Sequence, residues 1–339
     1  MKIYYRIQEE EIEILRCFGS DPRVVLPGQI EGVPVVRVAA YAFSDRGGIT
    51  DTGDRKLPDC QPGVGQAQEL GGGVFVCDIG EDTMFTEDEQ LLAGLNVEEI
   101  VFPDTVREIG NYIFYGCRQL KKLEFSNRLM QIGSGAFTRC SGLRYLKVHM
   151  KNGQKSCVKE ILGELWQRID VTFVYEQENS EAVLVFPEHY EEAVENTPAR
   201  ILFTQHHGSG NNYRQCFYNK EMDYRKYDSL FPVAAAWDRA EVLADIAFGR
   251  LGHPRNLAGS DRQAYQNLIR ERYQEILQCL IEKDQLENIR LISAEKLWSR
   301  EMLEYALDLA SGEKKMEILS YLMNEKQKNF KQQRKRFEL

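Results

Sequence analysis

The feature that most constrains this chain is a near-copy of one segment, 23 residues after its first occurrence. REIGNYIFYGCRQLKKLEF spans residues 107–125, and MQIGSGAFTRCSGLRYLKV spans residues 130–148. Seven positions recur at this constant offset. A fixed period of about 20 to 50 residues is typical of units that bury their apolar face only by stacking on a neighbour. The repeat therefore predicts a solenoid.

Within one unit, Leu123 and Phe125 alternate with Glu124, and the second copy repeats this alternation. Such a period of two indicates a strand with one buried face. We expect these strands to lie parallel, about 4.8 Å apart. The predicted core positions of the coils are Phe43, Ile109, Phe114, Cys117, Leu120, Leu123, Phe125, Ile132, Phe137, Cys140, Leu143 and Leu146.

Two further residue types recur at fixed places in the repeat. Gly110 and Gly133 are predicted to occupy a turn whose backbone other residues disfavour. Cys117 and Cys140 hold the same place in successive coils, which permits a disulfide or a metal pair. Because free cysteine is among the most buried residue types, we expect a column of buried thiols instead.

An earlier, divergent copy of the repeat lies in residues 23–43, and its second half resumes in residues 95–106. Between them, residues 44–95 are rich in Gly, Asp, Gln and Pro, which is typical of an inserted loop. A short strand is predicted within it at Val74–Cys77. Loops of this length are usually functional or disordered, so a binding or lid role and a mobile excursion both stay open.

The repeat resembles the BspA-type leucine-rich repeats of bacteria, whose units read as a strand ending in Pro, then Ile-Gly, Ala-Phe, Cys and Leu. IVFPDTVREIG, GAFTRCSGL and IEGVPVVRVAAYAF carry the resemblance, which covers residues 3–148 and is strongest over 97–148. Ile113 and Ala39 depart from the pattern. The resemblance implies a curved solenoid of stacked strands, protein recognition as the usual role, and no catalysis.

The ends of a short solenoid need closing elements. KIYYRIQEEEIEILRCF, from residue 2, alternates around an acidic turn and predicts a β-hairpin that caps the first coil. Residues 169–175 and 181–187 predict two more strands, either divergent coils or a closing ribbon. Between them and the repeats, residues 155–169 predict a helix whose Trp166 lies in the core.

From about residue 190 the composition shifts to helix formers. Helical periodicity predicts helices over 233–251, with Ala236 on the buried face, and over 261–282. Ser299 can cap the next helix and Gly312 can end it. A last helix would bury Met316, Leu319, Leu322 and Met323.

These patterns predict an α+β, two-domain chain: a short leucine-rich-repeat β-solenoid followed by an all-α helical-array domain. The predicted parts are residues 1–188 with the hairpin cap and the insertion 44–95, an aromatic-rich linker or docking segment at 189–232, and the helical domain 233–339. The helical part is weakly ankyrin-like, although the Thr-Pro-Leu-His signature is absent.

The segment 201–232 is where we expect a site, if the chain has one. A thiol needs a nearby base to become a thiolate, so a cysteine-dependent hydrolase or transferase is one hypothesis. The alternative is that the aromatic residues of this segment dock one domain on the other. The candidates are Cys216 as nucleophile, His206 or His207 as base, and Asp223 or Asp228 to orient the imidazole.

No cofactor is expected. GSGNNY lacks the longer glycine pattern and the Lys-Ser/Thr of a phosphate loop. His206, His207 and Cys216 have no recognised metal-ligand spacing, so no metal is expected either.

Eight cysteines without a CxxC pair do not describe a disulfide framework, so reduced thiols are expected. The N-terminus lacks the basic and apolar regions of a signal peptide, and no stretch approaches the roughly 18 apolar residues of a membrane span. These observations predict a cytoplasmic protein without membrane contact.

The net charge of −9 disfavours nonspecific binding to nucleic acid. One exception is a basic tail, which is more often a solvated terminus. Its basic residues are Lys328, Lys331, Arg334, Lys335 and Arg336.

Three functions are therefore open. The first is a non-catalytic intracellular scaffold that binds unknown protein partners through its stacked repeats. The second is the cysteine-dependent enzyme, and the third is a nucleic-acid-associated protein that uses the basic tail.

Overall fold

The computed structural model describes residues 1–45, 68–71, 73–79, 90–196 and 201–330. The chain forms two compact units. Unit 1 is Met1–Glu181 with Phe186–Asp223, and unit 2 is Ala182–Val185 with Tyr224–Leu339. The division into 1–188, 189–232 and 233–339 stays a prediction.

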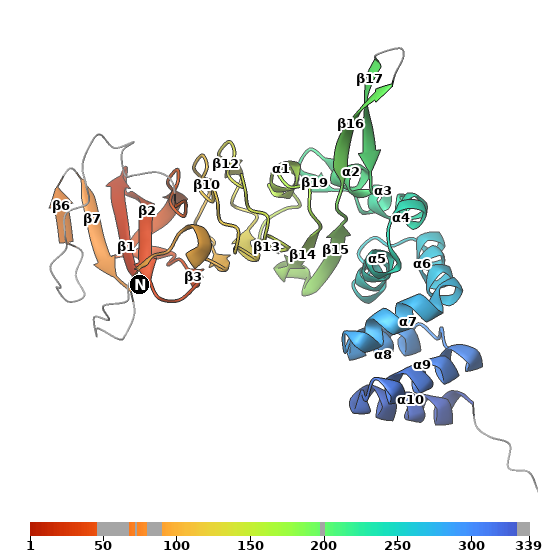
Figure 1. Ribbon diagram of the computed structural model, residues 1–339. Helices are drawn as coiled ribbons and strands as arrows, with labels where there is room; N and C mark the ends of the chain where they lie inside the picture. The colour runs from red at the N-terminus through yellow and green to blue at the C-terminus, as the bar shows by residue number, and fades with distance from the viewer. Residues whose placement is uncertain (46–67, 72, 80–89, 197–200, 331–339) are drawn as a thin grey trace, which may run out of the picture. The chain divides into compact units, whose positions relative to one another are not determined.

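Unit 1 contains two stacks of parallel strands, joined coil by coil (Figure 1). The second stack pairs Ile100 with Leu123, Leu123 with Leu146, and Leu146 with Val171. The constant offset in the sequence is thus a register of stacked strands, which confirms the predicted β-solenoid. The first stack consists of β2 (Glu11–Gly19), β5 (Val33–Val38), β10 (Glu108–Ile109) and β12 (Gln131–Ile132), and the second of β3 (Arg23–Val25), β9 (Glu99–Val101), β11 (Lys122–Ser126), β13 (Tyr145–Met150) and β14 (Ile169–Tyr175).

A column of phenylalanine rings fills the coil interior. The ring of Phe114 lies 5.7 Å from that of Phe43 and 5.3 Å from that of Phe137, between centroids. The Cys117 thiol donates to the Phe43 carbonyl at 3.1 Å, and the Cys140 thiol to the Phe114 carbonyl at 3.0 Å. The predicted core positions are all buried except Ile132, which is half-buried in β12.

The repeated glycines are required for space, and the predicted turn conformation is wrong. Neither Gly110 nor Gly133 has a positive φ. A Cβ at Gly110 would stand 2.3 Å from the Ala40 nitrogen, and one at Gly133 would stand 2.3 Å from the Asn111 nitrogen. Glycine is needed here because the backbones of successive coils touch.

The N-terminal end of the solenoid is the predicted β-hairpin of β1 (Lys2–Gln8) and β2. Part of the insertion joins this sheet: β7 (Val74–Asp78) pairs with β1, β6 (Gln68–Gly71) with β7, and β8 (Gln90–Leu91) with β2. The strand predicted at Val74–Cys77 is therefore confirmed. Residues 46–67, 72 and 80–89 of the insertion lie outside the described residues.

The insertion leaves and re-enters the coil at one place. The Gly94 nitrogen, at the start of η2 (Gly94–Asn96), donates to the Phe43 carbonyl at 2.9 Å. A short strand, β4 (Gln29–Ile30), pairs with β5 before the insertion. The first coil is thus completed by residues on both sides of the insertion.

At the other end, α1 (Val158–Gly163) lies within the predicted helix and buries Val158, Ile161 and Leu162. The prediction for Trp166 is wrong, since its side chain is 64% exposed. The helix ends at Gly163, so Trp166 no longer follows the helical stripe. The Glu164 carboxylate accepts from the Gly135 nitrogen at 3.1 Å and the Phe137 nitrogen at 2.8 Å. It takes the place of carbonyls that another coil would supply.

The predicted linker is folded. β15 (Ser180–Phe186) is divided between the two units, and β16 (Tyr190–Asn196) and β17 (Ile201–His207) form an antiparallel hairpin. α2 (Gly210–Arg214), β18 (Phe217–Tyr218) and β19 (Glu221–Met222) complete unit 1, with η3 (Glu176–Glu178) after β14.

Arg214 holds this segment against the end of the solenoid. Burial lowers the pKa of its guanidinium to about 10. The cation is stabilised by backbone oxygens alone among the contacts that the structure shows for it, since its nitrogens donate to the carbonyls of Leu162, Leu165, Gln167, Pro187 and Gly210.

Unit 2 is helical, which confirms the predicted α+β organisation. Two predicted helices are each divided, because the backbone leaves the helical conformation at Asp238 and at Arg272. Ala236 is exposed as a result. The described helices are α3 (Tyr224–Ser229), α4 (Phe231–Trp237), α5 (Ala240–Gly252), α6 (Gly259–Glu271), α7 (Tyr273–Glu282), α8 (Leu286–Ala294), α9 (Arg300–Gly312) and α10 (Met316–Asn329).

The predicted ends of α9 are confirmed. The Ser299 hydroxyl accepts from the Met302 nitrogen at 3.0 Å, and the helix ends at Gly312. The predicted stripe of α10 is partly wrong. Leu322 is buried, but Met316 is 70% and Met323 51% exposed.

The helix pairs α7–α8 and α9–α10 repeat at an offset of 30 residues, a period that the sequence reasoning did not find. The Gln285 nitrogen donates to the Leu280 carbonyl at 2.8 Å, and the Lys315 nitrogen to the Ala310 carbonyl at 2.9 Å. Asp284 and Lys314, at the same place in the two turns, both have φ of 57°. Unit 2 therefore contains stacked helix pairs of one design.

Candidate interaction surface

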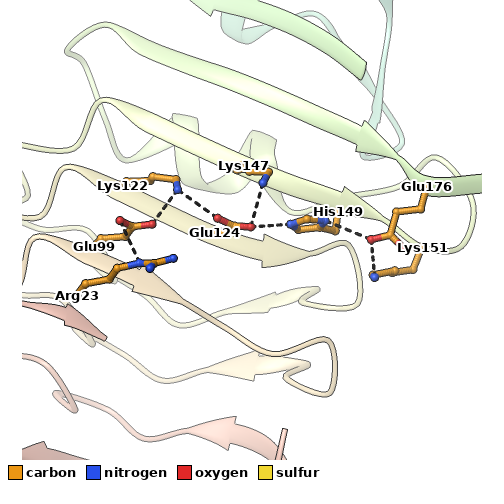
Figure 2. A network of polar contacts seen from close by, with 8 residues as sticks. All are labelled: Arg23, Glu99, Lys122, Glu124, Lys147, His149, Lys151 and Glu176. Carbon is orange, nitrogen blue, oxygen red and sulfur yellow. Dashed lines mark hydrogen bonds and ion pairs between the residues drawn. The ribbon is translucent and has the colours of Figure 1, made fainter. Parts of the chain in front are cut away.

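The outer face of the second strand stack carries a network of polar side chains (Figure 2). Leu123 and Phe125 of β11 point into the coil, so Lys122 and Glu124 point outward. Parallel register then aligns outward residues of successive strands. One such row is Arg23, Glu99, Lys122, Tyr145 and Asp170.

Charges of opposite sign alternate along this row. Arg23 Nε lies 3.4 Å from Glu99 Oε2, and Lys122 Nζ lies 2.7 Å from Glu99 Oε1. Lys122 Nζ also lies 3.2 Å from Glu124 Oε2. Opposite charges on neighbouring strands stabilise a sheet modestly and hold the side chains in place. Ion pairs therefore hold the side chains of this face in place. Because charges of both signs occur along the row, the face has no strong electrostatic potential of one sign.

Glu124 is the centre of the network in Figure 2. Its Oε1 atom lies 3.3 Å from Lys147 Nζ and 2.8 Å from His149 Nε2. Partial burial by itself raises the pKa of Glu124, but hydrogen bonds from His149, Lys122 and Lys147 outweigh it and lower that pKa to about 2. A carboxylate that stays ionised in this way does not serve as a general acid near neutral pH.

His149 links Glu124 to a second carboxylate. Its Nδ1 atom lies 3.2 Å from Glu176 Oε1, and that oxygen lies 2.5 Å from Lys151 Nζ. Lys151 Nζ lies 2.9 Å from Asp104 Oδ2 as well. The network thus extends from β3 to η3 across the whole face.

Tyr145 lies among these charges and is 54% exposed. It belongs to β13, between Lys122 of β11 and Asp170 of β14. Asp170 is itself held by Arg168, with Oδ1 2.8 Å from Nε. An exposed aromatic ring thus lies among charged side chains that ion pairs hold in place.

The residues of the enzyme hypothesis are differently placed. Cys216 is 0% exposed, and its thiol contacts the Asn212 carbonyl at 3.8 Å. His207 stacks on Tyr190 with ring centroids 4.3 Å apart, and its Nε2 lies 3.1 Å from Glu192 Oε2. The thiol is therefore inside the fold, while His207 lies on the β16–β17 hairpin.

The other candidates have separate surroundings. The backbone of His206 pairs with Glu191 in β17, and its side chain lies outside the described residues. Asp223 is exposed. Asp228 belongs to unit 2, where Arg250 holds both of its oxygens, at 2.7 and 2.8 Å.

Disulfides, metal sites and membrane-spanning helices are not seen within the described ranges. The seven cysteines described there are free, and no group of three or more His, Cys, Asp and Glu side chains there could hold a metal ion. Across the same ranges, no helix combines the length and apolar character needed to cross a membrane. Of the basic tail, Lys328 lies on α10 beside Glu325, whereas Lys331, Arg334, Lys335 and Arg336 lie outside the described residues.

The sequence analysis missed the residues of the polar face, although it noted that Glu124 alternates with Leu123 and Phe125. The signal was available, because Glu99, Lys122 and Tyr145 recur at the repeat offset of 23. Any residues that share the repeat offset lie side by side on neighbouring coils. Reading the outward positions in this way would have found the row.

The stacked parallel coils of unit 1 define a β-solenoid. Residues 88–160 match the family described as the BspA type leucine rich repeat region (6 copies), so this chain carries BspA-type repeats, as the resemblance implied. No curated protein matches the chain.

One solved structure, that of a T. pallidum leucine-rich repeat protein (TpLRR), is similar to the chain. The identity is 22% over 42% of this chain and 67% of that chain. The TM-score is 0.21.

Proposed function

We propose that this chain is a non-catalytic scaffold that binds another protein through the outer face of β3, β9, β11, β13 and β14. The observation that carries the proposal is Tyr145, 54% exposed within a network of paired charges. Aromatic side chains surrounded by polar contacts supply much of the energy at protein interfaces. The family match supports the same role.

The paired charges favour a partner with a mixed polar surface. Around Tyr145 the side chains of Lys122, Lys147, Glu124 and Asp170 are already held in ion pairs. Pre-organised side chains lose little conformational entropy on binding. The row has two positive and two negative side chains. A strongly basic ligand such as a nucleic-acid-binding tail, or a strongly acidic one, would therefore meet as many repulsive as attractive charges.

The test is affinity purification of the intact protein from its native cells, followed by titration of each partner found. Tyr145→Ala is expected to weaken binding by about 2 kcal/mol, roughly thirtyfold in Kd. Lys147→Glu, which replaces a cation beside Glu124 by a second carboxylate, is expected to weaken binding as well. Gln131→Glu is the control, because Gln131 is an exposed residue of the other strand stack. Equal affinity for the Tyr145→Ala and Gln131→Glu variants would refute the proposal.

The cytoplasmic location is part of the proposal. The described cysteines are free and six of them are buried. Reduced, buried thiols suit a reducing compartment. Cell fractionation with an antibody against the chain tests the location.

A further inference from the structure

The turns that join the two strand stacks are basic, although the chain as a whole is acidic. Residues 110–121 join β10 to β11, and residues 133–144 join β12 to β13. Together these turns contain four lysine and arginine residues and no aspartate or glutamate, whereas the whole chain has a net charge of −9. The turns therefore form a local surface of positive charge, which attracts acidic groups.

Arg139 is a cation of this surface that no carboxylate of the described residues neutralises. Lys121, by contrast, is paired with Glu98, with 2.7 Å between Nζ and Oε2. The Arg139 side chain is exposed, and its guanidinium lies over the Tyr115 ring, 5.3 Å from the ring centre. A guanidinium that stacks on an aromatic ring keeps its N–H groups free to bind a planar anion such as a carboxylate.

Arg118 is a second cation of this kind, and it leaves the neighbouring coil close by. The Gly116 nitrogen, two residues before it, donates to the Thr138 carbonyl at 3.1 Å, directly before Arg139. Arg118 is exposed. Within the described part of the chain, its side chain has no carboxylate partner either. Two unneutralised guanidiniums thus project from adjacent turns.

Several side chains of these turns stand where glycine would be unstrained. Tyr41, Tyr112 and Gly135 hold the same place in successive coils, with φ of 57°, 52° and 64°. Gly116 and Arg139 also correspond to each other, with φ of 80° and 64°. A left-handed backbone is unfavourable for tyrosine and arginine, and strain of this kind is concentrated at functional sites. The strain indicates that these side chains serve a purpose besides folding.

The strained side chains belong to one cluster. The rings of Tyr41 and Tyr112 stack with centroids 5.5 Å apart, and Tyr112 meets Tyr115 edge to face at 6.2 Å. The Tyr112 ring also fills the space over Gly135, since a Cβ there would stand 2.4 Å from its Cε1 atom. Ring faces are therefore used within the cluster, which leaves little flat surface on which a nucleobase could stack. Tyr112 is nevertheless 38% exposed, and no described residue bonds to its hydroxyl or to that of Tyr41.

We propose that this turn face binds an acidic peptide segment of a partner protein. The turn face consists of Tyr41, Tyr112, Tyr115, Arg118 and Arg139. Carboxylates of the peptide pair with the two guanidiniums, and the tyrosine hydroxyls donate to carboxylate or carbonyl oxygens. Tyrosine and arginine are among the residue types that contribute most to binding at protein interfaces. The turn face is separate from the outer face of the second strand stack, so the two surfaces bind independently.

Fluorescence anisotropy of a labelled hexaglutamate peptide, titrated with the full chain at low salt, tests the proposal. Arg139→Gly removes the guanidinium and relieves the left-handed backbone, because glycine holds the same place at Gly116. This variant is expected to raise the dissociation constant by at least about tenfold, while the thermal midpoint stays the same or rises. Arg225→Ala, which removes an exposed arginine of α3, is the matched control and should leave the affinity unchanged.

Two more variants separate the parts of the proposal. Tyr112→Phe removes one hydroxyl and keeps the ring, and it is expected to weaken binding by about fivefold. Tyr145→Ala, on the outer face of the second stack, should have no effect on this peptide.

Three results would overturn the proposal. The first is that hexaglutamate does not bind, and the second is that Arg225→Ala weakens binding as much as Arg139→Gly. The third is that a single-stranded DNA oligonucleotide of equal charge binds more tightly than the peptide and is weakened by Arg139→Gly, which would make the turn face a nucleic-acid site.

Discussion

The buried ion pair of unit 2 gives the sharpest stability prediction. Asp228 and Arg250 have side chains with 0% exposure. Asp228 accepts two bonds from Arg250, at 2.7 and 2.8 Å, and one from the Tyr265 hydroxyl at 2.7 Å. Burial alone lowers the pKa of Arg250, but the hydrogen bonds from its guanidinium to Asp228 raise it, so the cation is retained.

Asp228→Asn keeps the shape of the side chain and removes its charge. The Arg250 cation then faces a neutral amide, and its other contacts are the carbonyls of Arg255, at 2.7 Å, and of His253, at 3.4 Å, and the Tyr224 ring. Breaking a fully buried pair from one side costs about 3 to 5 kcal/mol, because an uncompensated charge stays inside. Asp228→Leu combined with Arg250→Met is expected to recover much of this loss, since both charges are removed together.

The assay is urea denaturation with hydrogen exchange read at the amides of α5 and α6. Asp170→Asn is the matched control: Asp170 also binds an arginine, Arg168, through two bonds of 2.8 and 2.9 Å, but the two side chains are 25% and 24% exposed. A pair of that exposure contributes about 1 kcal/mol or less, read at the amides of β13 and β14. If Asp228→Asn costs no more than Asp170→Asn, burial does not set the energy of this pair and the reasoning is wrong.

Three further predictions concern the coil glycines, the Glu124 carboxylate and the buried thiols. Gly110→Ala is expected to cost about 1 to 3 kcal/mol by overpacking, whereas Gly163→Ala, whose Cβ would meet nothing within 4 Å, should leave the thermal midpoint unchanged. Glu124 is expected to titrate with a pKa of about 2, so the stability from its ion pairs is present above pH 4.5 and lost as the pH falls toward 2; an NMR midpoint near 4.5 would contradict this. In the native protein, Cys216 is expected to react with a thiol reagent more slowly than the half-buried Cys279, and rapid labelling of Cys216 would revive the enzyme hypothesis.

The solenoid was predictable because its constraint is periodic. A constant offset forces Ile100, Leu123 and Leu146 into one column whatever the rest of the chain does. The glycines were recognised at the right positions for the wrong reason. Their need arises from contact between coils, which no property of a single turn reveals.

The failures lie at helix ends that the sequence analysis did not place. Trp166 fits a helical stripe, but the helix stops at Gly163 and the stripe with it. Arginine is not a helix-breaking residue, yet the backbone at Arg272 leaves the helical conformation and so separates α6 from α7.

The polar face was half predictable. Contacts within the repeat, such as Glu99 with Lys122, follow from the offset. The bridge from His149 to Glu176 does not, because Glu176 lies in the short η3 helix after the last strand. Residues outside the period can be placed only by the structure.

The meeting of Phe43 and Gly94 has a consequence for how such a chain can vary. Since the two ends of the 44–95 excursion are joined by a backbone hydrogen bond of 2.9 Å, the coil is closed whatever is threaded between them. Segments of different length or content could be grafted at this point without displacing the coils that follow. The junction between Phe43 and Gly94 is therefore a place where inserted segments could vary, and with them binding specificity, while the repeat scaffold is unchanged.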